Sequence, residues 1–108
     1  MTSTGNRPGR SDEELFAALH VLAKPLLDAG WKVFDTPTDS DGQLGDSVFY
    51  CMERAGVRIE LEYYDLGDLA AWPHDNDDPD DPAESLFWLM ETNAEECRRA
   101  FEDEGWLP

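Results

Sequence analysis

The first apolar pattern along the chain has the period of an amphipathic helix. Between Ser11 and Gly30, leucines recur three or four positions apart at 15, 19, 22 and 26, which places them on one helical face. Ser11 and Glu14 stand at capping-box spacing, so each side chain can accept a bond from the other residue's backbone N–H. Gly30 suits the left-handed position that ends a helix. We therefore predict a helix over 11–30 that buries its leucine face.

The middle of the chain changes to a period of two, which is typical of strands. The segment "VRIELEYY", residues 57–64, alternates apolar and polar side chains, so we expect one face in the core and the other in water. Shorter apolar segments predict strands at 31–36, 47–53 and 69–73. A two-residue turn at Ala55 and Gly56 would pair Glu53 with Arg58, whereas a three-residue loop with a bulge would pair Glu53 with Val57. The pattern leaves this choice open.

The segment "SLFWLM", residues 85–90, fits either a helix or a strand. Asp81, Pro82 and Glu84 form a helix-start signal before it. Asn93 and Glu96 form a second helix-start signal just after residues 85–90, and this signal would have no role inside a continuous helix. We therefore predict a fifth, buried strand at 85–90. A second helix follows from about Ala94 to Glu104, with four inward residues: Ala94, Cys97, Ala100 and Phe101.

These elements together predict an α+β fold with an N-terminal helix, an antiparallel sheet of four or five strands, and a C-terminal helix packed on the sheet. The chain has 108 residues, of which 41% are hydrophobic, and this is enough for one domain, which we place at 11–108. The polar tail 1–10 is expected to be disordered. The sequence shows neither an apolar run long enough for a membrane span nor a signal-peptide pattern, so the expected location is the cytoplasm.

Charge is the strongest compositional signal. The chain has 25 acids and 8 bases, a formal net charge of -17, and it carries no Lys or Arg between Arg58 and Arg98. Such a surface repels nucleic acid and anionic membranes and speeds encounters with basic proteins. The acids are densest at 74–84, and three more crowd the end of the second predicted helix, where the helix dipole disfavours them. The candidate partner-binding residues are Asp75, Asp77, Asp78, Asp80, Asp81, Glu102, Asp103 and Glu104.

Motifs for metal binding and catalysis are missing from the pattern. A calcium loop begun at Asp75 would have Pro79 and Asp80 at its fifth and sixth places, and "DSDG" at 39–42 lacks the final glutamate. The two cysteines and two histidines do not have the spacing of a Cys-based zinc framework, and we expect both thiols to be buried and reduced. There is no phosphate loop or nucleophile elbow. We expect no metal, no cofactor and no catalytic residue.

Two functional classes remain. The first is a non-enzymatic acidic interaction module, whether adaptor, chaperone-like factor or regulator, that binds a basic surface of a partner protein. The alternative is a DNA-mimic inhibitor, which needs carboxylates in two rows on a long rigid face. A proline-interrupted acidic stretch fits that requirement poorly, and we favour the interaction module. A purely solubilising role for the acidic stretch is a third possibility. Partner identity and oligomeric state do not follow from the sequence.

Overall fold

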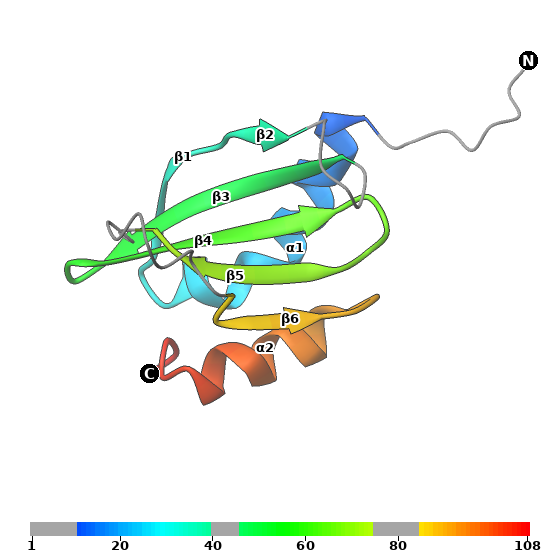
Figure 1. Cartoon of the computed structure of the whole chain (residues 1–108). Helices are drawn as coiled ribbons and strands as arrows, with labels where there is room; N and C mark the ends of the chain where they lie inside the picture. The colour runs from blue at the N-terminus through cyan, green and yellow to red at the C-terminus, as the bar shows by residue number, and fades with distance from the viewer. Residues whose placement is uncertain (1–10, 40–45, 75–84) are drawn as a thin grey trace, which may run out of the picture.

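The computed structural model describes residues 11–39, 46–74 and 85–108, and it confirms the predicted α+β fold (Figure 1). The elements are α1 (Asp12–Asp28), β1 (Lys32–Asp35), β2 (Thr38–Asp39), β3 (Ser47–Arg54), β4 (Val57–Tyr64), β5 (Leu69–Pro73), β6 (Phe87–Leu89) and α2 (Ala94–Asp103). The prediction of a strand at 85–90 is confirmed by β6, while β2 was not predicted. The expected disordered tail and both rejected calcium loops involve residues outside the described ranges.

All strand pairs are antiparallel, in the order β1-β3-β4-β5-β6, and the short β2 also pairs with β3. In the β3–β4 hairpin Glu53 pairs with Arg58. Ala55 and Gly56 have φ of 52° and 83°, and a two-residue type I′ turn requires positive φ at both positions. The two-residue turn is therefore the correct alternative. This register also fixes Cys51 opposite Glu60.

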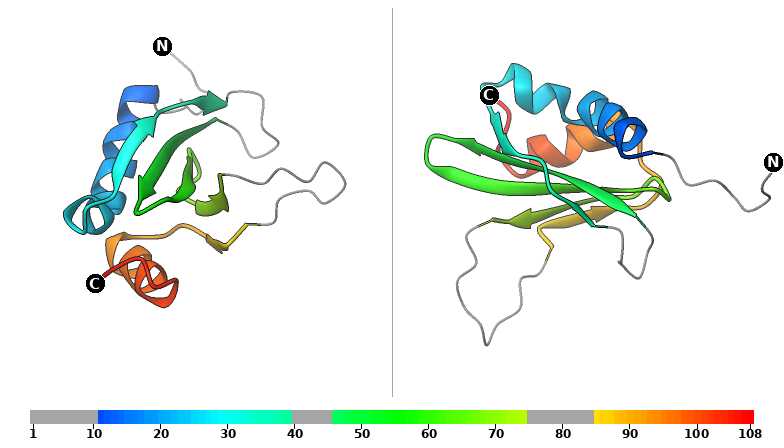
Figure 2. Two further views of the ribbon diagram at one scale, coloured as in Figure 1. Left: turned by 90° about the vertical axis from the view of Figure 1, so that its left-hand side faces the viewer. Right: turned by 90° about the horizontal axis from the view of Figure 1, so that it is seen from above.

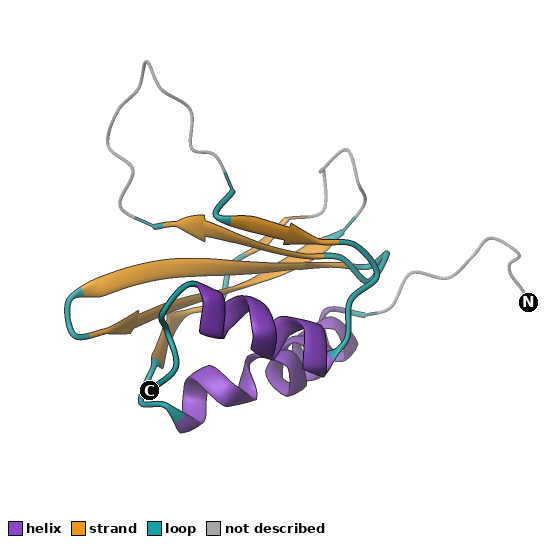
Figure 3. Cartoon of the chain, turned by 90° about the horizontal axis from the view of Figure 1, so that it is seen from below, coloured by secondary structure: helices purple, strands orange, loops and turns teal. Residues whose placement is uncertain are grey.

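Both helices cover the same face of the sheet, as the views from above and below show (Figures 2 and 3). The core lies between these two layers. The predicted leucine stripe is confirmed, because Leu15, Leu19, Leu22 and Leu26 are all buried. From the sheet, alternate residues of β3 and β4 point into the same core. Within the described residues the opposite face of the sheet carries no helix (Figure 3), and we call it the helix-free face. That second face holds the polar and aromatic groups considered below.

The helix ends follow the local signals. In the capping box the Ser11 N–H donates to Glu14 Oε1 (3.1 Å) and the Glu14 N–H donates to Ser11 Oγ (3.2 Å). Gly30 has a φ of 100°, which lets the Trp31 N–H donate to the Leu26 carbonyl at 3.0 Å. The end of α2 repeats this geometry at Gly105, and the Trp31 indole then donates to the Trp106 carbonyl. The two caps thereby join both helix ends in one aromatic contact.

The predicted burial is wrong for four residues of β4 and α2. Glu62 and Tyr64 are only 6% and 7% exposed, although the alternation of β4 predicts that they face water. Val57 is half exposed instead of buried, because it lies at the hairpin end that projects past the helices (Figure 3). Ala94 is exposed because it is the first residue of α2. Over the described residues, no helix is both long enough and apolar enough to cross a membrane.

Candidate functional site

The helix-free face of the sheet is organised around a buried carboxylate on β4. Glu62 accepts a hydrogen bond from Ser47 Oγ at 2.7 Å and another from Trp72 Nε1 at 3.0 Å. Burial, followed by the hydrogen bond to Glu62 and its negative charge, raises the pKa of Tyr64. Buried carboxylates are stable only when such donors satisfy their oxygens. Glu62 therefore ties β3, β4 and β5 together on this face.

A second buried carboxylate attaches β6 to the β4–β5 turn. Asp68 is 6% exposed and accepts bonds from Trp88 Nε1 and from the Glu91 N–H, both at 2.9 Å. The Trp88 ring stacks on Tyr64 with centroids 5.1 Å apart and meets Trp72 edge-on at 6.2 Å. Trp88 is thus held by one hydrogen bond and two ring contacts. These contacts fix the position of Trp88 within the fold.

An exposed apolar row runs along β6. Leu86, Trp88 and Met90 are 41%, 36% and 76% exposed, and they alternate with Phe87 and Leu89, which pack against the core. We call these three residues the β6 row. The prediction of a fully buried strand is therefore wrong, because Trp88 is exposed and Phe87 and Leu89 are only partly buried. The reason is that β6 is the last strand of the sheet's order and the helices cover only one face.

A further cluster joins three strands on the same helix-free face. Cys51 on β3 pairs with Glu60 on β4, and His74 follows the end of β5, with its Nδ1 2.6 Å from Glu60 Oε2. Phe34 meets the His74 ring edge-on at 5.1 Å. Burial, and then the charges of Glu60 and Asp35, raise the pKa of the Cys51 thiol to about 11. The sequence analysis missed this cluster because it judged metal sites by the spacing of cysteines and histidines along the chain, whereas sheet pairing brings these residues together.

The candidate acids divide into two groups. Asp75, Asp77, Asp78, Asp80 and Asp81 lie outside the described residues. Glu102, Asp103 and Glu104 are exposed at the end of α2, whose last turn has no basic residue. This end of α2 lies beside the start of β6, because Phe87 contacts Phe101 and Trp106 at centroid distances of 6.1 and 5.8 Å (Figure 1). The three acids belong to the helix layer, on the opposite side of the sheet from the β6 row.

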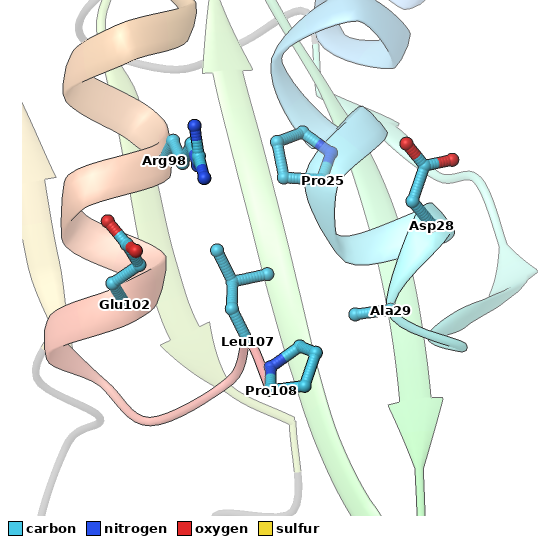
Figure 4. Close-up of a pocket in the computed structure, with 7 residues that line it drawn as sticks. All are labelled: Pro25, Asp28, Ala29, Arg98, Glu102, Leu107 and Pro108. Atoms are coloured by element: carbon cyan, nitrogen blue, oxygen red, sulfur yellow. The ribbon is translucent and has the colours of Figure 1, made fainter.

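A shallow pocket separates the two helices (Figure 4). Its volume is about 410 Å³, and it is lined by Pro25, Asp28, Ala29, Arg98, Glu102, Leu107 and Pro108. The lining combines two carboxylates with one guanidinium and contains no Cys, His, Ser or Thr. It therefore holds neither a nucleophile nor a set of metal ligands. Of the surface features of this structure, the pocket has the least specific chemistry.

Comparisons with protein-family models, curated proteins and solved structures found no match for this chain.

The other cysteine makes a testable contribution to stability at high pH. Cys97 is fully buried on α2, and burial, with a smaller contribution from Glu96, raises its pKa from 9.0 to about 11. Between these values the unfolded chain loses a proton that the folded chain keeps, so stability falls as the pH rises, by at most about 1.4 kcal/mol per pH unit. Urea unfolding should show a weaker loss of stability for Cys97→Ala than for the wild type over this range. Equal slopes would contradict the assignment.

Proposed function

We propose that this protein is a non-enzymatic interaction module, of an adaptor, chaperone-like or regulatory kind, that binds a basic and partly apolar segment of a partner protein. The observation that carries this proposal is the β6 row: three large apolar side chains, exposed at alternate positions of one short segment in a chain with 25 acids and 8 bases. Exposed apolar rows bordered by polar residues are typical of binding surfaces. The acidic surroundings set the sign of the partner's charge.

The side chains of the β6 row have properties suited to an interface centre. Aromatic residues and methionine are enriched in protein interfaces, and tryptophan is common among the residues that dominate affinity. Trp88 is already fixed by Asp68 and Tyr64, so it loses little conformational freedom on binding. Met90 is 76% exposed and has a flexible thioether that can adapt to a partner's shape. Trp88 is thus a rigid contact residue, and Met90, two positions further along the chain, is an adaptable one.

The acids contribute electrostatic attraction to the proposed interface rather than shape complementarity. Glu91 directly follows the β6 row, and Asp75, Asp77, Asp78, Asp80 and Asp81 precede it along the chain. Long-range attraction of this kind raises the association rate and weakens as salt is added. Lys24, Arg58 and Arg99 are already engaged by Asp28, Glu53 and Glu95, which leaves the acids in excess. A partner with lysines or arginines beside apolar residues fits both features.

No observation favours the DNA-mimic alternative. On α2, Arg98 and Arg99 separate the acids of the first turn from Glu102, Asp103 and Glu104. On β4, Glu62 is buried and its oxygens are bonded within the protein. The described carboxylates of these two elements therefore do not supply the continuous rows that imitation of a phosphate backbone needs. A purely solubilising role would leave the β6 row without a purpose.

Peptide binding tests the proposal. The probes are two labelled peptides of equal length and charge, one alternating lysine with leucine and one alternating lysine with glutamine. We expect the lysine–leucine peptide to bind more tightly by fluorescence anisotropy. Met90→Ser should weaken its binding roughly fivefold, the loss of about 1 kcal/mol that an interface residue of moderate importance contributes. Met90 is largely exposed, so this variant should keep the stability of the wild type.

The matched control is Val57→Ser. Val57 is also a half-exposed apolar residue of the sheet, but it lies at the hairpin, at the other end of β4 from the residues that pair with β5 next to β6. We expect it to leave peptide affinity unchanged. Equal binding of the two peptides, together with no effect of Met90→Ser, would show that the chain attracts cations generally and would overturn the proposal.

A further inference from the structure

Three chemically different metal-binding side chains converge on the helix-free face. Cys51 and Glu60 face each other across β3 and β4. On β5, Trp72 pairs with Glu60 of β4. His74 lies two residues after Trp72, and its backbone N–H donates to the Arg58 carbonyl. One thiol sulfur, one carboxylate oxygen and one imidazole nitrogen lie within 4.8 Å of one another. Sheet pairing, rather than sequence spacing, brings them together.

We propose that Cys51, Glu60 and His74 bind a single divalent cation, for which zinc is the best match. The proposal is independent of the partner-binding function. A thiolate, an imidazole and a carboxylate are the three ligand types of zinc sites in proteins. Calcium and magnesium prefer sites made only of oxygen ligands. Two anionic ligands and one neutral ligand would also balance the charge of the ion.

The distances between the three ligand atoms suit a zinc site after the side chains move slightly closer together. Ligand atoms around a tetrahedral zinc ion lie about 3.3–3.6 Å apart, given bond lengths of about 2.0–2.3 Å. The 4.8 Å limit of the cluster is therefore about 1 Å wider than a closed site. Cys51 is fixed on a central strand, whereas the Glu60 and His74 side chains are each 27% exposed and can adjust. The ion would replace the hydrogen bond that joins His74 Nδ1 to Glu60 Oε2 at 2.6 Å.

Among the described residues the cluster offers three ligands, one fewer than a tetrahedral zinc ion takes. Cys51 forms the buried side of the cluster, and Glu60 and His74 form its half-buried side. Three protein ligands leave the fourth tetrahedral position for water or for a group on a partner. The Phe34 ring lies against His74 and limits the imidazole's movement. The expected spacing of zinc motifs did not reveal this site, because its ligands are 9 and 14 positions apart along the chain. Two of them lie on neighbouring strands, and His74 follows the end of a third.

Cobalt provides the direct probe, because its bond to a thiolate absorbs in the near ultraviolet and its tetrahedral complexes absorb in the visible. Chelator-treated protein titrated with Co²⁺ should develop both absorptions with one ion per chain. Zinc should displace the cobalt, whereas an excess of Ca²⁺ or Mg²⁺ should not. His74→Gln should weaken cobalt binding at least about tenfold, as loss of a supporting group does in metal sites. Cys51→Ser should abolish the thiolate absorption.

The chain supplies matched controls for each ligand. Cys97 on α2 is the other buried thiol, and His20, which contacts the Tyr50 hydroxyl at 3.2 Å, is the other histidine. Cys97→Ser and His20→Gln should bind cobalt as the wild type does. Replacement of Asp75, Asp77, Asp78, Asp80 and Asp81 by Asn should also preserve the thiolate absorption, which separates the site from loose binding to the acidic stretch.

Several results would contradict the proposed metal site. One is weak, non-saturating cobalt binding without thiolate absorption. Another is thiolate absorption that survives in Cys51→Ser or disappears in Cys97→Ser. His74 is partly exposed, so His74→Gln should fold even where a change at the buried Cys51 does not. Unchanged cobalt affinity in folded His74→Gln would therefore reject the site by itself.

Discussion

Replacing Glu62 with alanine should lower the free energy of unfolding by about 2–5 kcal/mol, since each buried donor left without an acceptor costs about 1–3 kcal/mol. Besides the Tyr64 hydroxyl, the donors to Glu62 are Ser47 Oγ and Trp72 Nε1. Both bonds cross between strands, so their loss affects three strands of the sheet together. Urea unfolding followed by tryptophan fluorescence measures the change directly.

Two variants separate this hydrogen-bonding role from a general effect of charge. Glu62→Gln keeps the volume of the side chain and one acceptor oxygen, so it should lose less than half as much stability as Glu62→Ala. Glu60→Gln removes the same charge from the same face of β4, at a more exposed position, and should have a smaller effect still. Equal stability of Glu62→Ala and the wild type would show that the buried carboxylate does not hold this face together.

Replacing Asp75, Asp77, Asp78, Asp80 and Asp81 with Asn should reduce the affinity for the lysine–leucine peptide at least roughly tenfold at low salt, because attraction between an acidic surface and a basic partner raises association rates by about 10- to 1000-fold. The loss should appear mainly as a slower association rate and should shrink as salt is added. The variant should stay folded and be slightly more stable, since it removes repulsion among neighbouring carboxylates. Stopped-flow fluorescence and urea unfolding measure the two effects.

The comparison variant replaces Glu102, Asp103 and Glu104 by their amides, which removes three negative charges rather than five. These acids belong to the helix layer (Figure 3), so we expect a smaller loss of peptide affinity for each charge removed. Their removal should also stabilise α2, because each opposes the helix dipole by about 0.3–1 kcal/mol. Unfolding of the five-Asn variant would contradict the proposed role of the acidic stretch, since it would make those carboxylates structural.

Local signals were sufficient to predict most of the elements. The bounds of β4 and β5 are those of their apolar patterns. The caps at Ser11, Gly30, Asn93 and Gly105 depend on residues only a few positions apart, so they are visible in any short stretch of sequence. The choice of a strand at 85–90 was correct for the same reason: the start signal at Asn93 already accounted for the second helix.

The features that the sequence did not predict depend on pairing between strands that are far apart in the chain. Glu62 was expected in water because a glutamate on an alternating strand is usually exposed, and its donors, Ser47 and Trp72, lie on two other strands. The cluster of Cys51, Glu60 and His74 required the same register. That register depended on a turn for which the sequence allowed two forms. A one-residue shift would have turned every side chain of the strand to the other face.

The candidate site was predicted only in part. Composition identified the acids, but it could not distinguish an acidic binding surface from an acidic solubilising one. The β6 row was hidden because "SLFWLM" is apolar throughout, and a continuous apolar run predicts burial on both faces. Its exposure follows from two facts of the fold, namely the position of β6 at the end of the sheet's order and the absence of a described helix from that face.

The most direct test of the proposed binding surface is a map of amide chemical shifts in ¹⁵N-labelled protein as the lysine–leucine peptide is added. The account predicts that the largest changes fall on the backbone amides of Leu86, Trp88 and Met90 and on the Trp88 indole N–H, with smaller changes at Gly67 in the turn that contacts Thr92. Changes confined to α1 and α2, or spread evenly over the acidic residues, would contradict it.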